Sequence, residues 1–160
     1  MYLYHRVPQE MQGTTLLPLN VLRKTNPDLA EQYARKYVGR EWVSELRVPL
    51  LDNCLWGDVI FMSAVSLKEL FRGLRAAGLA LPAQMRMYAI DPGALDLDRT
   101  ALMESGFGED ESLYFKRFDP ACIAVYSIWP QRTIDYYRQE KLRAARPLLW
   151  EYVPHILYRG

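Results

Sequence analysis

Tyr4, His5 and Arg6 follow one another near the start of the chain and combine three kinds of side-chain chemistry. A histidine titrates near neutral pH, so it can act as a base or form a hydrogen bond with a ribose hydroxyl. Arginine can hold a phosphate group, and tyrosine can stack on a flat ring. These residues are the first candidate site. The structural alternative is a histidine bound to a backbone carbonyl, with Arg6 simply solvated.

Ser63 is a second candidate, because it ends a continuous apolar run over residues 59–62. A small hydroxyl at the end of a buried strand can reach into a cleft without blocking it. The ordinary role of Ser63 would be to turn the chain before Ser66, and Ser66 is the predicted N-cap of the following helix. Trp56 and Asp58, just before the run, could line a pocket, although a half-buried tryptophan beside a turn needs no function.

Glu109, Asp110 and Glu111 form an acidic group, and Glu111 is the candidate catalytic carboxylate. The commoner explanation for such a run is a solvated loop. His155 is the second histidine of the chain, and with His5 and an arginine it would suit a metal-independent ribonuclease. That hypothesis requires the two histidines to meet in space.

Several basic residues lie on or beside the last predicted long helix and could contact phosphate. Asp135 and Glu140 dilute this stripe, so a solvated helix face explains it equally well. The basic residues are Arg132, Arg138, Lys141, Arg143 and Arg146.

The hydrophobic pattern predicts strands and helices without a regular βαβ repeat, which indicates an α+β fold with a mixed or antiparallel sheet and three main helices in a single domain, 1–160. Strands are expected at residues 2–7, 42–49, 59–62, 85–91, 113–118, 123–129 and in the tail at 148–158. Helical turns are expected before residue 25, and helices at 26–39, 66–78, 98–105 and 133–145, with Thr133 as the cap of the last. Residues 106–111 are predicted to form a mobile loop.

The composition and the missing motifs exclude several classes of function. Twenty basic and nineteen acidic residues leave a formal charge of +1, so any nucleic-acid contact must come from a local patch. The sequence has no phosphate-binding glycine loop, dinucleotide fingerprint, GxSxG or HExxH. Cys54 and Cys122 are expected to be reduced and buried, and no metal site is expected. No signal peptide or membrane span is visible, which predicts a cytoplasmic protein.

The order of these pieces resembles the ADP-ribosyltransferase-like fold, especially the branch of RNA 2′-phosphotransferases and DarT-type nucleic-acid ADP-ribosyltransferases. The matching segments cover roughly the first two-thirds of the chain. They are Leu3-Tyr4-His5-Arg6, the leucine-rich segment through Pro18-Leu19, Asp58-Val59-Ile60-Phe61-Met62-Ser63, and Tyr88-Ala89-Ile90-Asp91-Pro92 before Leu95.

The resemblance implies NAD as cofactor and a nucleic acid or a protein as acceptor. His5 would orient the nicotinamide-side ribose, Arg6 would approach the pyrophosphate, and Tyr4 and Ser63 would belong to the same site. The chain departs from the family pattern, because no Gly-Thr pair follows His5 and no Glu-x-Glu occurs in a late strand. The rival hypothesis is a non-enzymatic binding or inhibitor module of a bacterial or phage conflict system, with exposed aromatics as its interface.

Overall fold

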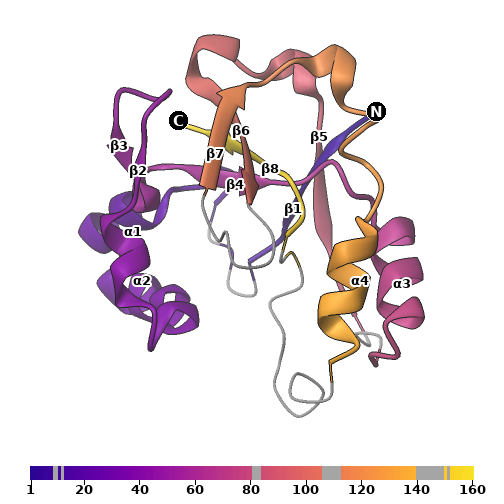
Figure 1. The fold of residues 1–160 in the computed structure, drawn as a ribbon. Coiled ribbons are helices and arrows are strands. Elements are labelled where there is room, and N and C mark those ends of the chain that lie inside the picture. The colour runs from indigo at the N-terminus through magenta and orange to yellow at the C-terminus, as the bar shows by residue number, and fades with distance from the viewer. Residues whose placement is uncertain (9–10, 12, 81–83, 106–112, 140–149, 151) are drawn as a thin grey trace.

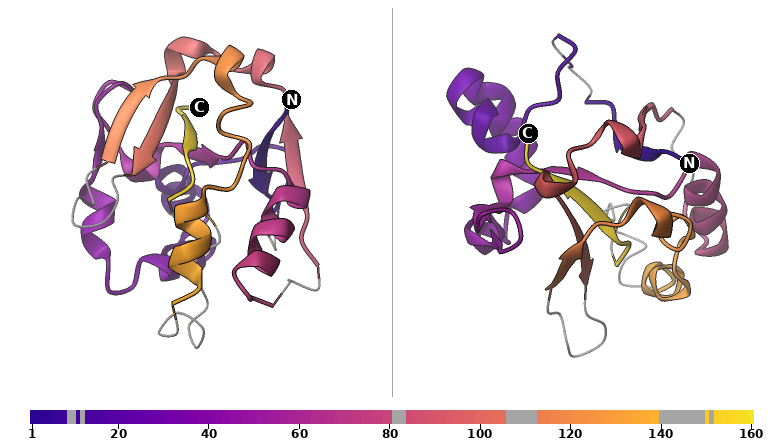
Figure 2. Two further views of the ribbon diagram at one scale, coloured as in Figure 1. Left: turned by 45° about the vertical axis from the view of Figure 1, so that its right-hand side comes forward. Right: turned by 90° about the horizontal axis from the view of Figure 1, so that it is seen from above.

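The computed structural model describes residues 1–8, 11, 13–80, 84–105, 113–139, 150 and 152–160, and these form an α+β domain (Figure 1). Helices α1 and α2 lie at one side of the strands, and α3 and α4 lie at the other (Figure 2). The described helices are α1 (Leu19–Thr25), α2 (Pro27–Ala34), α3 (Leu67–Ala76) and α4 (Gln131–Tyr137). The described strands are β1 (Leu3–Arg6), β2 (Arg47–Val48), β3 (Cys54–Leu55), β4 (Ile60–Met62), β5 (Met87–Ile90), β6 (Thr100–Ser105), β7 (Leu113–Arg117) and β8 (His155–Tyr158).

The main sheet has the strand order β4-β8-β6-β7, and its neighbouring strands are antiparallel. A second antiparallel pair, β1 and β5, joins the free edge of β4 through a single bridge. At this bridge Tyr4 N–H donates to the Ser63 carbonyl at 2.7 Å, and Ser63 N–H donates to the Tyr4 carbonyl at 2.9 Å. The predicted mixed or antiparallel sheet is thus antiparallel in every described strand pairing.

Apolar residues cover both faces of the main sheet, as the alternation of side chains along its strands requires. On one face Met103 and Leu157 pack with Val48 and Leu51, which come from the β2–β3 hairpin and its turn. On the other face Ile156 and Met62 pack with Leu3 of β1 and with the segment that follows β7. Burial on both sides explains why the run over 59–62 is uniformly apolar.

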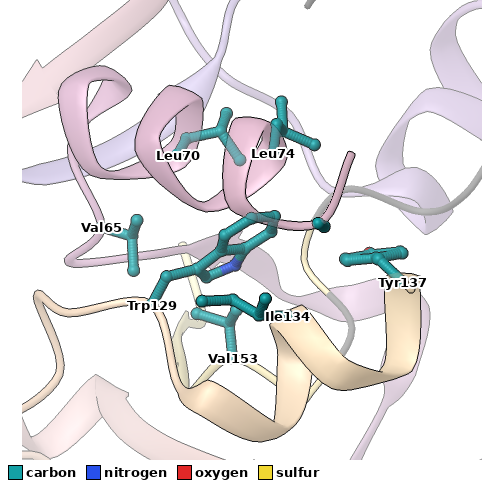
Figure 3. Packing of buried hydrophobic residues seen from close by; sticks show 8 residues of the cluster. Val65, Leu70, Leu74, Trp129, Ile134, Tyr137 and Val153 are labelled. Atoms are coloured by element: carbon teal, nitrogen blue, oxygen red, sulfur yellow. The ribbon is translucent and has the colours of Figure 1, made fainter. Parts of the chain in front are cut away.

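A third core lies between α3 and α4, and Trp129 fills it (Figure 3). The indole is 2% exposed and packs beside Leu70 and Leu74 of α3. An alanine at Gly73 would place its Cβ 1.2 Å from Cε3 of Trp129, so only glycine leaves room for the ring at this depth. The distance between the two helices is therefore set by a glycine on one side and an indole on the other.

The predicted helix starts of α2 and α3 are confirmed, because both depend on local signals. The Asn26 side chain accepts from Leu29 N–H at 3.2 Å, and Pro27 takes the first helical position. Ser66 Oγ accepts from Glu69 N–H at 3.3 Å. Gly78 follows α3 with φ at +75°, a left-handed conformation that ends the helix as predicted.

Two of the predicted elements are wrong in type. Residues 98–105 form a short 3-10 turn and then strand β6 rather than a helix, because the backbone of β6 pairs with β7 along one edge and with β8 along the other. Residues 123–129 form turns rather than a strand. Ile123 and Trp129, at the two ends of this segment, belong to different hydrophobic cores. The segment therefore runs from one core to the other, and its side chains do not alternate between two faces as those of a strand do.

Other expectations need smaller corrections. Of residues 42–49, only Arg47–Val48 is a strand, and Glu41–Glu45 is a 3-10 helix. Thr133 lies inside α4, which starts after Pro130. Cys54 is buried as expected, whereas Cys122 is only half-buried, and both are free thiols. The loop expected at 106–111 and the helix expected beyond residue 139 lie outside the described residues.

Candidate functional site

A cleft of about 540 Å³ opens beside the ends of β1 and β4, opposite α1 and α2. His5 and Arg6 line it, as do the leucine-rich segment before α1 and the start of β4. Three of the segments that carry the family resemblance therefore meet at one place. The full set of lining residues is His5, Arg6, Val7, Pro8, Leu16, Leu17, Pro18, Leu19, Leu22, Gln32, Tyr33, Lys36, Tyr37, Trp56, Gly57, Val59, Ile60 and Phe61.

His5 is half-buried, and its Nδ1 lies 2.7 Å from the Phe61 carbonyl oxygen. A carbonyl can only accept a hydrogen bond, so Nδ1 carries the proton and Nε2 of the neutral ring is left as an acceptor. Burial lowers the pKa of His5, and the positive charge of Lys36 acts in the same direction, while the hydrogen bond to Phe61 opposes them. The ring is therefore neutral at pH 7.

The register of β1 on β4 explains why the cleft opens at His5. In a continued antiparallel ladder, the next hydrogen-bonded pair after Tyr4 and Ser63 would be Arg6 and Phe61. Instead the imidazole of His5 takes the Phe61 carbonyl, and Val7 N–H donates to Arg86 on the other side. The His5 side chain thus bonds the part-buried Phe61 carbonyl at the point where β1 and β4 separate, which is the structural role considered for it in the sequence. The same side chain also lines the cleft that opens between the separating strands.

The charges that line the cleft are positive. Arg6 and Lys36 are both exposed, and no ion pair among the described residues involves either side chain. No carboxylate occurs among the lining residues in the part of the chain that the structure describes. An anionic ligand would therefore meet favourable charge without competition from a fixed carboxylate.

An aromatic wall stands next to these cations. Trp56 Nε1–H donates to the Tyr37 hydroxyl at 3.1 Å, and the Trp56 ring lies 4.6 Å from that of Phe61, centroid to centroid. The Lys36 ammonium lies 4.9 Å from the centroid of the Tyr37 ring. These contacts hold the rings in place, so the cleft presents preformed aromatic rings on which a planar ligand can stack.

Asp58 fixes α1 against the start of β4 and so holds the opposite side of the cleft. Its carboxylate accepts from Leu55 N–H at 2.9 Å and from Asn20 Nδ2 at 2.8 Å. Arg23 donates to Asn20 Oδ1 at 2.8 Å, which orients the amide. A Cβ at Gly57 would come within 2.6 Å of the Asn20 side chain, so glycine is needed for this close approach.

We expect Asp58→Ala to lower the free energy of unfolding by about 1–3 kcal/mol, because it leaves a part-buried backbone N–H and the Asn20 amide without their acceptor. Urea denaturation would measure the change. Asp98→Ala is the matched control, since the Asp98 carboxylate is 92% exposed and its nearest cation is 3.9 Å away. That control should change stability by less than about 0.5 kcal/mol. Equal effects of the two substitutions would contradict the role of Asp58.

The structure places the other sequence candidates outside the cleft lining. Tyr4 precedes His5 on β1 and does not line the cleft. Ser63 is 3% exposed, and its hydroxyl accepts from Val65 N–H at 3.1 Å, which is the turn-forming role. Glu111 lies outside the described residues. Trp56 lines the cleft, whereas Asp58 stands behind it.

His155 contacts Phe61, which is itself part of the cleft lining. The two rings meet edge to face, with centroids 6.1 Å apart, and His155 does not line the cleft. Burial lowers the pKa of His155 to about 4, and a backbone hydrogen bond with Val153 opposes this shift only in part. His5 bonds the Phe61 carbonyl and lines the cleft, whereas His155 contacts the Phe61 ring and does not, so the cleft does not bring the two histidines together as a histidine-pair ribonuclease requires.

The basic residues of the last helix are used in part for structure. Arg132 donates to the Tyr152 carbonyl at 3.2 Å, and Arg138 donates to the Ala76 carbonyl at the end of α3 at 3.1 Å. Lys141, Arg143 and Arg146 lie outside the described residues. The described part of this stripe thus connects elements of the fold.

Sequence reasoning missed the contribution of α2 and the 3-10 turn after it. Gln32, Tyr33, Lys36 and Tyr37 all line the cleft, and their spacing puts them on one helical face. That spacing is visible in the sequence as polar and aromatic residues at positions i, i+1, i+4 and i+5. This spacing could have predicted that the four residues share one helical face, but it could not have predicted which part of the protein that face lies against.

No protein-family model, curated protein or solved structure matches this chain. No described helix has the length and apolar character that crossing a bilayer requires. Within the described ranges, no three residues among histidine, cysteine, aspartate and glutamate come together as a metal site.

Proposed function

We propose that the cleft binds a nucleotide and that its ligand is NAD, as the family resemblance implies. The observation that carries this proposal is the combination of Arg6 and Lys36 with a preformed aromatic wall in one cleft whose described lining has no carboxylate. A nucleotide presents the complementary groups, which are anionic phosphates and planar rings. The cleft volume of about 540 Å³ lies within the range of small-ligand sites.

His5 supports the proposal through its fixed hydrogen-bonding polarity. Because Nδ1–H is used by the Phe61 carbonyl, the free ring nitrogen accepts rather than donates. A ribose hydroxyl can donate to it, and the lowered pKa keeps the ring neutral for this purpose. Arg6, one residue further along β1, would approach the pyrophosphate.

Transfer of ADP-ribose to a nucleic acid or a protein is the activity that follows if NAD binds. Such chemistry passes through an oxocarbenium-like centre and needs a carboxylate to hold the ribose or to activate the acceptor. Glu111 is the candidate from the sequence. The non-enzymatic binding module remains the alternative.

Calorimetric titration with NAD tests the proposal, with His5→Asn as the informative variant. The asparagine amide can still donate to the Phe61 carbonyl, but it lacks the second ring nitrogen. We expect saturable binding below millimolar NAD for the unmodified protein and about tenfold weaker binding for His5→Asn, or ~1.4 kcal/mol. The thermal unfolding midpoint should change little.

His5→Ala is the comparison variant, since it removes both ring nitrogens and leaves a buried carbonyl unpaired. It should lose stability as well as affinity. If the unmodified protein gives no binding heat up to several millimolar NAD, the proposal is wrong and the binding module becomes the better hypothesis. Unchanged affinity in His5→Asn would assign His5 a purely structural role.

A further inference from the structure

We propose, resting on the nucleotide site proposed above, that Lys36 acts with Arg6 to hold the phosphate groups of the ligand and thereby places a ribose beside His5. Lys36 lies in the 3-10 turn Arg35–Tyr37 after α2, outside the segments that carry the family resemblance. The family resemblance therefore did not predict Lys36 as a site residue, and only the structure places it in the cleft lining.

The first support is the position of the ammonium group. Lys36 Nζ lies 4.9 Å from the centroid of the Tyr37 ring, and the Tyr37 hydroxyl accepts from the Trp56 indole at 3.1 Å. Tyr37 and Trp56 are themselves part of the cleft lining. The cation thus lies over an aromatic surface that is held by a hydrogen bond, which limits the positions open to a flexible side chain.

The second support is the proximity of Lys36 to His5. Lys36 and His5 line the same cleft, and the positive charge of Lys36 contributes to the lowered pKa of His5. In a nucleoside diphosphate the phosphates are bonded directly to the ribose. A phosphate on Lys36 therefore brings ribose hydroxyls toward the ring nitrogen of His5 that remains free to accept.

The third support is that the charge of Lys36 is available. None of the ion pairs among the described residues involves it, and the described lining of the cleft holds no carboxylate. Gln32 of α2 also lines the cleft, four residues before Lys36. It adds an uncharged donor and acceptor beside the ammonium.

Titrations with sodium pyrophosphate and with NAD test this proposal in the unmodified protein, in Lys36→Gln and in Lys68→Gln. Lys68 is an exposed lysine of α3 that does not line the cleft, so it controls for the change in net charge. We expect Lys36→Gln to weaken both ligands about tenfold, as loss of a charged hydrogen bond does. Lys68→Gln should bind both ligands as the unmodified protein does.

The outcomes separate this proposal from the proposed function. Equal binding of both ligands by the unmodified protein and Lys36→Gln would overturn the role of Lys36 and leave the NAD site standing. Binding of pyrophosphate that depends on Lys36, without any binding of NAD, would support an anion site and reject NAD as the ligand. If neither ligand binds the unmodified protein up to several millimolar, both proposals are wrong.

Discussion

Replacing Gly73 by alanine should destabilise the protein by about 3 kcal/mol or more, although the same change in an ordinary helix stabilises it by about 1 kcal/mol. The reason is that the new Cβ would lie 1.2, 2.1 and 2.4 Å from Cε3, Cζ3 and Cδ2 of Trp129. The indole is 2% exposed and lies between α3 and α4 among the other side chains of this core (Figure 3). Urea denaturation measures the loss directly.

A glycine-to-alanine change that destabilises a helix is the opposite of the ordinary effect, so a control glycine without a steric clash is needed for comparison. Gly93→Ala is the control, since a Cβ there meets only the Asp91 carboxylate at 3.4 Å and the backbone needs no positive φ. Combining Gly73→Ala with Trp129→Leu should remove most of the extra cost of the alanine, because the clashing ring atoms are gone. A stabilised Gly73→Ala protein would mean that the indole does not occupy this position.

The second large effect is a loss of stability in mild acid, caused mainly by His155. The unfolded chain protonates this histidine near its ordinary pKa of 6.5, whereas the folded protein resists protonation until about pH 4. The unfolded state therefore binds more protons between these values, and stability falls as the pH is lowered through them. The full difference corresponds to about 3 kcal/mol at 1.36 kcal/mol per unit of pKa.

Stability measured by urea denaturation at pH 7 and at pH 4.5 checks this expectation. His155→Gln removes the titrating ring, so its stability should depend much less on pH over the same interval. His5 acts in the same direction, because its pKa is also lowered, and part of the dependence should remain in the variant. An identical pH dependence in the variant and the unmodified protein would contradict the assignment to His155.

The elements that could be predicted from the sequence are those whose ends are determined locally. Asn26 with Pro27 and Ser66 with Glu69 mark helix starts without any tertiary contact. Strand β6 could not be recognised in this way, since the residues from Asp98 suit a helix and only pairing with β7 and β8 makes them a strand. In segment 123–129, Val125 and Ile128 are 73% and 59% exposed, so their β-branched character gave a misleading signal.

The candidate site was predictable on one side only. His5 and Arg6 were recognisable because their types differ from the apolar strand around them, and both line the cleft. Ser63 was expected at the same site, but its bridge to Tyr4 directs it into the turn before α3. Lys36 and Tyr37 were missed because nothing in a single sequence says which helix face will lie opposite a given strand.

Strand β8 has a consequence for how the chain can fold as it is made. Residues 155–158 lie between β4, which starts at residue 60, and β6, which starts at residue 100, and they supply pairing to both. On the ribosome, β4 and β6 emerge long before the strand that joins them, with apolar faces that have no partner yet. Such long-range pairing slows folding and exposes strand edges to aggregation. The β6–β7 pair can form earlier, but the four-stranded sheet is complete only after residues 155–158 have left the exit tunnel.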